Sequence, residues 1–312
     1  MTAPAIARPA AGDLPRPAAR RRRDRTGSVV EGYFRAHTAL VYAFLYLPII
    51  VVVVFAFNGT TRATTVWGGF SLRWFGIALG DEVVHAALLN SFIVAIPNAI
   101  LATLFGTMAA LGLQRVGKRL RLTFDVLTYI SVIVPEIVIA LATLVMFATS
   151  FDLIQSWFGV RLLFGHVTII LAHVLFNTSL VLLLVRARLA GMDRTLVDAS
   201  ADLFATPWRT FVQITMPMLL PAIVAGFLLS FTFSFDDYVI TFFVSGPGSS
   251  TLPLFIFGQV KRGVTPETNA VAAMMLGLTV LTLLIGQLAL SLQARRTGRA
   301  SAGTVAEMVA EA

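Results

Sequence analysis

The sequence predicts an all-α integral membrane protein with six transmembrane helices. Of its 312 residues, 57% are hydrophobic and 13% are charged, and the mean hydropathy is +0.83. A soluble domain carries about 25% charged residues, because its surface must interact with water. Six stretches reach the roughly 20 mostly apolar residues that a helix needs to cross the hydrocarbon core. They lie at about 38–57, 88–113, 123–148, 162–185, 219–243 and 268–292.

Residues 1–37, which precede the first span, are predicted to form a disordered basic tail. Eight of the 24 basic residues lie in its first 35 positions, including the arginine run 20–23, among many Pro and Ala residues. Such a segment buries too little apolar surface to fold. The apolar stretch that follows lacks a small-residue cleavage site, so we expect a retained membrane anchor and not a removed signal peptide.

The loops predict the orientation of the chain, because Lys and Arg collect on the cytoplasmic side of membrane proteins. With the N-terminus in the cytoplasm, 19 of the 24 basic residues lie inside and five lie outside. We therefore predict that both termini are cytoplasmic, with a transmembrane domain at 38–293 and a second cytoplasmic tail at 294–312. The net charge of +8 then reflects membrane orientation and not nucleic-acid binding.

Several kinds of chemistry have no support in the sequence. There is no cysteine, which excludes disulfides, thiolate metal sites and cysteine nucleophiles. The histidines show no metal-ligand spacing, and Ser, Asp and His form no recognisable triad, so we predict no catalytic residue and no metal site. The histidines are His37, His85, His166 and His173.

The loop at about 187–218, between the fourth and fifth spans, predicts a short amphipathic helix on the cytoplasmic side. Apolar residues recur there at helical spacing with acidic residues between them, and Pro207 is expected to end the helix. The apolar residues are Leu196, Val197, Ala199, Leu203 and Phe204. One interpretation is a helix lying in the headgroup layer. However, residues 195–208 hold no Lys or Arg, which a helix that binds anionic lipid requires. Docking into the groove of a partner protein is therefore favoured.

This loop also resembles the "EAA" loop of the permeases of binding-protein-dependent ABC importers. The resemblance is carried by Asp198, Ala199, Ser200, Leu203, Phe204, Ala205, Pro207, Trp208, Phe211, Thr215, Met216, Pro217 and Pro221. It implies a coupling helix, with contacts from Asp198 through Pro207, that sits in a cleft of an ABC ATPase subunit. Two residues depart from the family pattern, since Asp198 replaces the usual Glu and Phe204 replaces the usual Gly.

Further segments resemble the second permease subunit of putrescine and spermidine importers, and the similarity covers roughly residues 40–293. They are 90–95, 135–138, 234–248, 250–254 and 263–270. The resemblance implies a type I ABC importer permease fold. It also implies a second homologous permease subunit and a periplasmic or extracellular substrate-binding protein as partners.

Acidic residues within the predicted spans are candidates for a translocation path, since a carboxylate at the bilayer centre costs about 2.5–3.5 kcal/mol on insertion scales. Glu136 is expected about 13 residues into the third span, and Asp236 and Asp237 about 16 residues into the fifth. Ser230, Ser234, Asp237 and Thr241 share one helical stripe, while Asp236 faces elsewhere. The path candidates are Glu136, Asp237, Asp236, Ser234 and Thr241. Alternatively, these acids bind neighbouring helices, cap a broken helix or form a periplasmic gate. His173 and Asn177 are expected to hydrogen-bond between helices.

These inferences predict a permease subunit of an ATP-driven importer in the cell (inner) membrane, which moves polyamines inward by alternating access and is not an enzyme. Residues 112–119 nearly match a phosphate-binding loop, but they lack its Ser or Thr and follow a membrane helix. We therefore expect no cofactor in this chain, with ATP and magnesium bound by the separate ATPase. The alternatives are a permease for ferric iron, thiamine or phosphonate, or a secondary transporter.

Overall fold

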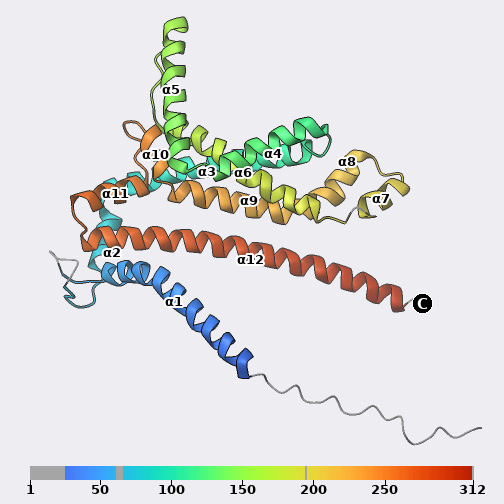
Figure 1. Ribbon diagram of the computed structural model, residues 1–312, viewed down its shortest axis with the longest axis horizontal. Coiled ribbons are helices and arrows are strands. Elements are labelled where there is room, and N and C mark those ends of the chain that lie inside the picture. The colour runs from blue at the N-terminus through green and yellow to red at the C-terminus, as the bar shows by residue number, and fades with distance from the viewer. Residues whose placement is uncertain (1–24, 61–65, 194, 311–312) are drawn as a thin grey trace, which may run out of the picture. The chain divides into compact units, whose positions relative to one another are not determined.

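A computed structural model describes residues 25–60, 66–193 and 195–310, which are almost entirely helical (Figure 1). The elements are α1 (Arg25–Ala56), α2 (Arg73–Gly80), α3 (Glu82–Gly112), α4 (Lys118–Ile133), α5 (Glu136–Phe158), α6 (His166–Ala190), α7 (Thr195–Asp202), α8 (Pro207–Thr210), the π-helical turn η1 (Phe211–Thr215), α9 (Met216–Asp236), α10 (Val239–Val244), α11 (Leu252–Arg262) and α12 (Pro266–Ala310). Contacts divide the chain into two units, Met1–Val51 and Val52–Ala312.

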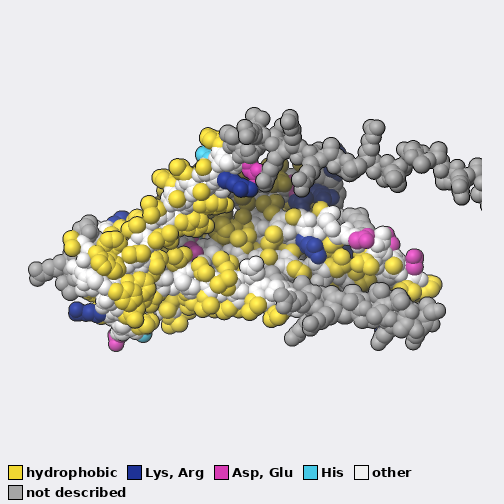
Figure 2. Space-filling model, turned by 90° about the horizontal axis from the view of Figure 1, so that it is seen from below, with side chains coloured by type: hydrophobic (Ala, Val, Ile, Leu, Met, Phe, Trp, Pro, Cys, Tyr) yellow, Lys and Arg dark blue, Asp and Glu magenta, His cyan; other side chains and the backbone are white. Residues whose placement is uncertain are grey.

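Six helical segments among the described residues are long and apolar enough to cross a membrane, which confirms the predicted fold class. They are Val30–Ala56, Glu82–Gly112, Glu136–Phe158, His166–Ala190, Pro207–Asp236 and Pro266–Leu288. Hydrophobic side chains cover most of the described surface that is visible in Figure 2. Many are large and largely exposed, such as Leu104 and Met108 on α3 and Ile133 on α4. This exposure fits contact with lipid, which has no preference for polar groups.

The first helix begins earlier than the sequence predicts. It starts at Arg25, so residues 25–37 are helical and not disordered as expected. Its apolar side chains, including Leu40, Phe44 and Leu47, are largely exposed within their own unit. The arginine run 20–23 lies outside the described residues.

Helices α3, α6 and α9 pack together to form the centre of the second unit (Figure 1). Small residues on their facing sides allow close approach, as is typical of membrane helices. A Cβ atom added at Gly106 of α3 would lie 2.7 Å from Cβ of Val181 on α6. Likewise, a Cβ at Gly226 of α9 would lie 3.2 Å from Cγ1 of the same valine. Val181 is therefore held between two glycines, and its own exposure is 0%.

The predicted third span, 123–148, is not one helix. It divides into α4 and α5 at Val134 and Pro135, and Val134 has an extended backbone with ψ of 133°. Proline disfavours the helical conformation of the residue before it and donates no backbone hydrogen bond. The two parts pack on different partners, α4 on α6 and α5 mainly on α10. Glu136 is consequently the first residue of α5 and not a mid-helix residue.

The predicted fifth span, 219–243, is also interrupted. Helix α9 ends at Asp236, α10 begins at Val239, and Asp237 between them is extended with ψ of 130°. No proline lies at this break. Instead, the Asp237 side chain supplies hydrogen-bond acceptors for the first backbone N–H groups of α10. The sequence places this acidic pair inside one continuous helix, whereas the structure places it at a helix boundary.

Candidate functional site

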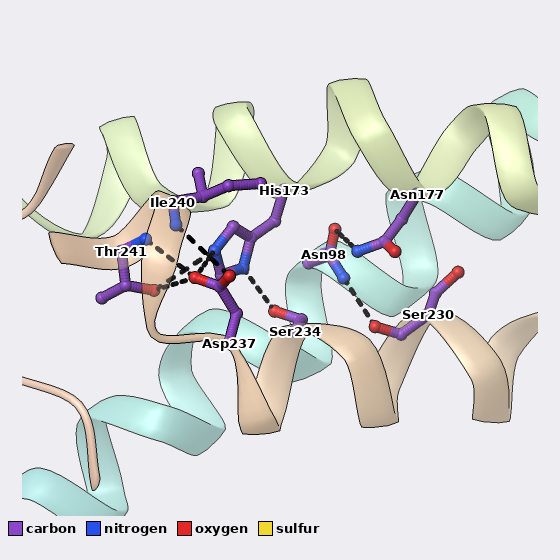
Figure 3. A network of polar contacts seen from close by, with 8 residues as sticks. All are labelled: Asn98, His173, Asn177, Ser230, Ser234, Asp237, Ile240 and Thr241. Atoms are coloured by element: carbon purple, nitrogen blue, oxygen red, sulfur yellow. Dashed lines mark hydrogen bonds and ion pairs between the residues drawn. The ribbon is translucent and has the colours of Figure 1, made fainter. Parts of the chain in front are cut away.

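A buried polar cluster joins α6 to the break between α9 and α10 (Figure 3). We call its members, His173, Ser234, Asp237 and Thr241, the histidine cluster. The Nε2 atom of His173 lies 3.0 Å from Oδ2 of Asp237, and its Nδ1 atom lies 2.7 Å from Oγ of Ser234. The hydroxyl of Thr241 donates to Oδ2 of Asp237 over 2.7 Å. His173 and Asp237 are 1% and 8% exposed, so water contributes little to stabilising either side chain.

Asp237 also caps α10. Its Oδ2 atom accepts from the backbone N of Thr241 at 2.7 Å, and Oδ1 accepts from the backbone N of Ile240 at 3.3 Å. A carboxylate at a helix N-terminus satisfies N–H groups that have no partner within the helix. These bonds offset the desolvation of the buried carboxylate, which would cost several kcal/mol if it were unpaired. The histidine cluster therefore stabilises both the helix break and the packing of α10 against α6.

The contacts join Asp237, His173 and Ser234 in the residue order of a Ser-His-Asp triad, but the two ring nitrogens are exchanged, since Nε2 faces the carboxylate and Nδ1 faces the hydroxyl. This arrangement was missed by sequence reasoning, which found no such set, because His173 lies more than 60 residues before its two partners. The geometry gives no access to a substrate, however. Ser234 is only 4% exposed, and both oxygens of Asp237 are used in capping. The hydrogen bonds of His173 connect α6 to the break between α9 and α10. This is the interhelical role that the sequence predicts for His173.

Glu136 and Asp237, two of the candidate path residues, lie at the two helix breaks. Glu136 is the first residue of α5, and α5 packs mainly on α10, whose first backbone N–H groups are capped by Asp237. Glu136 is exposed, whereas Asp237 is buried. The two breaks therefore place one accessible acid and one buried acid on neighbouring elements.

The remaining polar residues of the predicted stripe form separate contacts. Ser230 offers its backbone oxygen to Nδ2 of Asn98 at 3.0 Å, and Asn177 donates to Oδ1 of Asn98 at 3.3 Å. Asp236 points elsewhere and accepts from the hydroxyl of Thr279 on α12 at 3.0 Å. Asn177 therefore bonds between helices, as predicted. Ser230 and Ser234 face neighbouring helices in this conformation, and their role in a path stays a prediction.

The loop predicted for partner docking holds two short helices, α7 and α8. Oδ1 of Asp193 accepts from the backbone N of Thr195, the first residue of α7, at 2.9 Å, and this bond lowers the pKa of Asp193. The hydroxyl of Ser200 lies 2.9 Å from that of Thr210, which ties α7 to α8. Asp198 and Ala199 are exposed, while Ser200 is buried.

An exposed apolar surface lies between α7 and α8, and we call Leu203, Phe204 and Trp208 the loop knob. Their exposed fractions are 82%, 95% and 71%. The helix before it ends at Asp202, and Pro207 begins α8, so the prediction that Pro207 itself ends the first helix is wrong. Of the other two residues predicted at this surface, Ala205 is half-buried and Pro207 is exposed.

The end of α7 depends on an unusual backbone at Phe204, whose φ is +55°. The backbone N of Phe204 donates to the carbonyl of Ala201 and that of Ala205 to the carbonyl of Ser200, a pair of bonds that defines a Schellman motif. Glycine usually occupies this left-handed position, because a side chain there costs roughly 1–2 kcal/mol. Phe204 thus preserves the turn in which the importer permeases carry Gly.

Comparison with known proteins places the chain among permeases. A family model described as "Binding-protein-dependent transport system inner membrane component" matches residues 102–299. The chain is 41% identical over 239 residues to the putrescine transport system permease protein PotI of Escherichia coli (strain K12), covering 76% of this chain and 83% of that protein. The chain belongs to this permease family.

A second relative of the permease is the spermidine/putrescine transport system permease protein PotC of Haemophilus influenzae. It is 37% identical over 249 residues, covering 80% of this chain and 93% of that protein. The permease also has the fold of a chain in the crystal structure of a bacterial ABC transporter that imports the acidic polysaccharide alginate. The TM-score is 0.69 at 15% identity, covering 86% of this chain and 96% of that one. The predicted family and the type I importer fold are therefore confirmed.

Proposed function

We propose that this permease is one of two transmembrane subunits of an ATP-driven importer for polyamines. It lies in the inner membrane with both termini in the cytoplasm. A separate ABC ATPase binds ATP and magnesium and drives alternating access, and a substrate-binding protein delivers the polyamine from outside.

The observation that carries this proposal is the 41% identity to a putrescine permease over 239 residues. The relative at 37% identity is also named for spermidine and putrescine transport. All of these substrates are flexible cations with primary ammonium groups. Their transport requires acidic or aromatic groups to replace the water that surrounds each ammonium group.

The acidic residues supply such groups. Glu136 is exposed at the start of α5, which packs on α10, and Asp236 is exposed at the end of α9. In this proposal Glu136 and Asp237 attract one ammonium group between two carboxyls, and the second permease subunit covers the exposed side of Glu136. Movement of α5 or α10 would separate these acids, which would release the cation.

The loop knob provides the connection to the ATPase. Leu203, Phe204 and Trp208 present apolar area with acidic residues beside it, including Asp198 and Asp202. In this proposal the loop knob enters a groove of the ATPase. When the ATPase dimer closes on ATP, it moves α7 and α8. Because η1 connects α8 to α9, this movement also displaces α9. This route leads directly to the α9–α10 break that holds Asp237.

Uptake by the complete complex tests the substrate. The permease, its partner permease, the ATPase and the binding protein would be reconstituted in proteoliposomes with labelled putrescine or spermidine and internal ATP. We expect ATP-dependent uptake of at least one of the two. Uptake of ferric iron, thiamine or phosphonate alone would contradict the polyamine assignment, and uptake without any ATPase would indicate a secondary transporter.

Copurification tests the coupling. The ATPase should purify with the wild-type permease, and Asp198→Lys should release it by placing a cation on the exposed acidic edge. The matched control is Asp152→Lys on α5, far from this loop in sequence, which should leave the ATPase bound. Labelling of Asp198→Cys by an impermeant thiol reagent from the periplasmic side of intact cells would contradict the proposed orientation.

A further inference from the structure

Three aromatic side chains gather beside the α9–α10 break, and a lysine lies over two of them. The Nζ atom of Lys261, near the end of α11, is 5.0 Å from the ring centroid of Phe257 and 5.8 Å from that of Phe242. The ring of Tyr238 lies 4.1 Å from that of Phe257 and 5.6 Å from that of Phe242. We call Tyr238, Phe242 and Phe257 the aromatic cluster. Both distances from Lys261 are within the roughly 6 Å over which a cation is attracted to a ring face.

The aromatic cluster lies at the opposite end of the helix bundle from the loop knob (Figure 1). The N-terminal end of α3 holds the segment that leads into α11, because Asn90 donates to the carbonyls of Gly248 and Ser250 and Ser91 accepts from the backbone N of Leu252. The C-terminal end of α3 instead packs near Leu189 and Met192, just before α7. From Asn90 to Ala110, α3 rises by about 30 Å at 1.5 Å per residue.

The cluster adjoins the acidic residues along the chain. Tyr238 directly follows Asp237, and it precedes the first residue of α10. The aromatic cluster is therefore directly adjacent along the chain to one of the proposed path carboxylates. In the proposed orientation this end faces outward, where a binding protein would release its substrate.

The group that occupies the aromatic cluster, the Lys261 ammonium, has the same chemistry as the ammonium groups of the proposed polyamine substrate. Lys118 and Lys261 are the only lysines among the 24 basic residues of the chain. A lysine side chain is a primary ammonium group on a flexible stem of four carbons. One end of putrescine is the same group on the same length of chain. Arginine, which carries nearly all of the basic charge elsewhere in this chain, presents a planar group of different shape.

The rings also remain accessible. Phe242 and Phe257 are 48% and 39% exposed, and Lys261 is exposed. An arriving ammonium group can therefore reach the ring faces, and the Lys261 side chain can withdraw into water. A cation–π contact at an exposed site is worth only about 0.5–1 kcal/mol, so the exchange has a low cost.

We propose that the aromatic cluster is a binding site for a primary alkylammonium group, and that Lys261 occupies it until the ammonium group of an arriving substrate displaces it. The identity of that substrate as a polyamine rests on the proposed function. Between transport cycles, the Lys261 ammonium group prevents the rings from packing directly on one another and from binding lipid. It also competes with the substrate at low substrate concentration.

Uptake at subsaturating putrescine by the reconstituted complex tests this competition. Lys261→Met removes the competing ammonium but keeps the length of the side chain, and we expect initial uptake to rise about threefold. Phe257→Leu removes one ring face, and uptake should fall about threefold. In the double variant, Lys261→Met should no longer raise uptake. Arg262→Met is the matched control, since it removes a neighbouring positive charge, and it should leave uptake unchanged.

Two uptake results would overturn the proposal. Equal effects of Lys261→Met and Arg262→Met would mean that general charge, and not occupation of the rings, controls entry. Wild-type uptake by Phe257→Leu would mean that the rings bind no substrate. If the wild-type complex moves no polyamine at all, the proposed function fails, and the ring site is then decided by the following measurement.

Nuclear magnetic resonance of the full-length permease in nanodiscs tests the site without transport. Reductive methylation with ¹³C-formaldehyde labels both lysines and keeps their charge. We expect ring currents to shift the Lys261 methyl signal upfield of the Lys118 signal, and added butylammonium should return it toward the Lys118 position. Lys261→Arg assigns the signal. A Lys261 signal that coincides with that of Lys118, or that butylammonium does not move, would overturn the proposal.

Discussion

His173 on α6 and Asp237 at the α9–α10 break form a buried hydrogen bond at 3.0 Å, at the point where the fifth span is interrupted. Since the capping oxygen of Asp237 is the same atom that faces His173, the helix break and the interhelical contact depend on each other. The predictions below begin with this relationship.

Removing either member of the pair should destabilise the permease. His173→Ala or Asp237→Ala removes one hydrogen-bond partner from a buried polar group, which typically costs about 1–3 kcal/mol. The double variant should lose less stability than the two single losses added together. Thermal unfolding in nanodiscs, followed by intrinsic fluorescence, would measure this coupling. Additive losses would show that the two side chains act independently.

Replacing the accessible acid should affect transport more than stability. Glu136→Gln keeps the shape of an exposed side chain and removes its charge, so unfolding should change by less than about 0.5 kcal/mol. Putrescine uptake should fall about tenfold, because the proposed two-carboxyl arrangement with Asp237 is lost. Glu82→Gln, which alters an exposed acid in the first turn of α3, should keep wild-type uptake. If the two variants transport equally well, Glu136 takes no part in the path.

The left-handed backbone at Phe204 predicts different outcomes for two small residues. Phe204→Gly should stabilise the turn after α7 by about 1 kcal/mol, because glycine adopts positive φ without strain. Phe204→Ala loses the same ring but keeps the strain, so it should show no such gain. Hydrogen exchange of the α7 amides would measure the difference. Equal protection in both variants would mean that strain at residue 204 is unimportant.

The contact between Gly106 and Val181 predicts a rescue experiment. Gly106→Ala places a methyl group against the side chain of Val181, and overpacking of this kind costs about 1–3 kcal/mol. Adding Val181→Gly should recover much of the loss, because it removes both the Cβ and the Cγ1 atoms that the new methyl group would meet. Gly112→Ala, in the same helix with no neighbouring atom within 4 Å, is the control and should be neutral. A failure of Val181→Gly to rescue would place the strain elsewhere.

Much of the architecture could be predicted because it depends on local properties of the chain. Whether a stretch is apolar enough to enter lipid is a sum over its own residues, so the number of spans could be predicted, although the third lies at Glu136–Phe158 and not at 123–148. The break before Glu136 was missed, although Pro135 was a visible signal, because membrane helices often accommodate proline. The loop knob was expected as a docking helix from its apolar spacing. Its actual form, a helix that ends at Asp202 with Phe204 in a left-handed turn, was not.

The sequence by itself determined that this protein enters the membrane, how many times it crosses, and which acidic residues need an explanation there. It also carried the family resemblance, since motif residues lie close together along the chain. Only the tertiary structure decided that Asp237 bonds to His173, that Glu136 begins a helix packed on α10, and that Lys261 lies over two aromatic rings. Hydrophobicity belongs to each residue, whereas these contacts depend on how helices distant in sequence pack together.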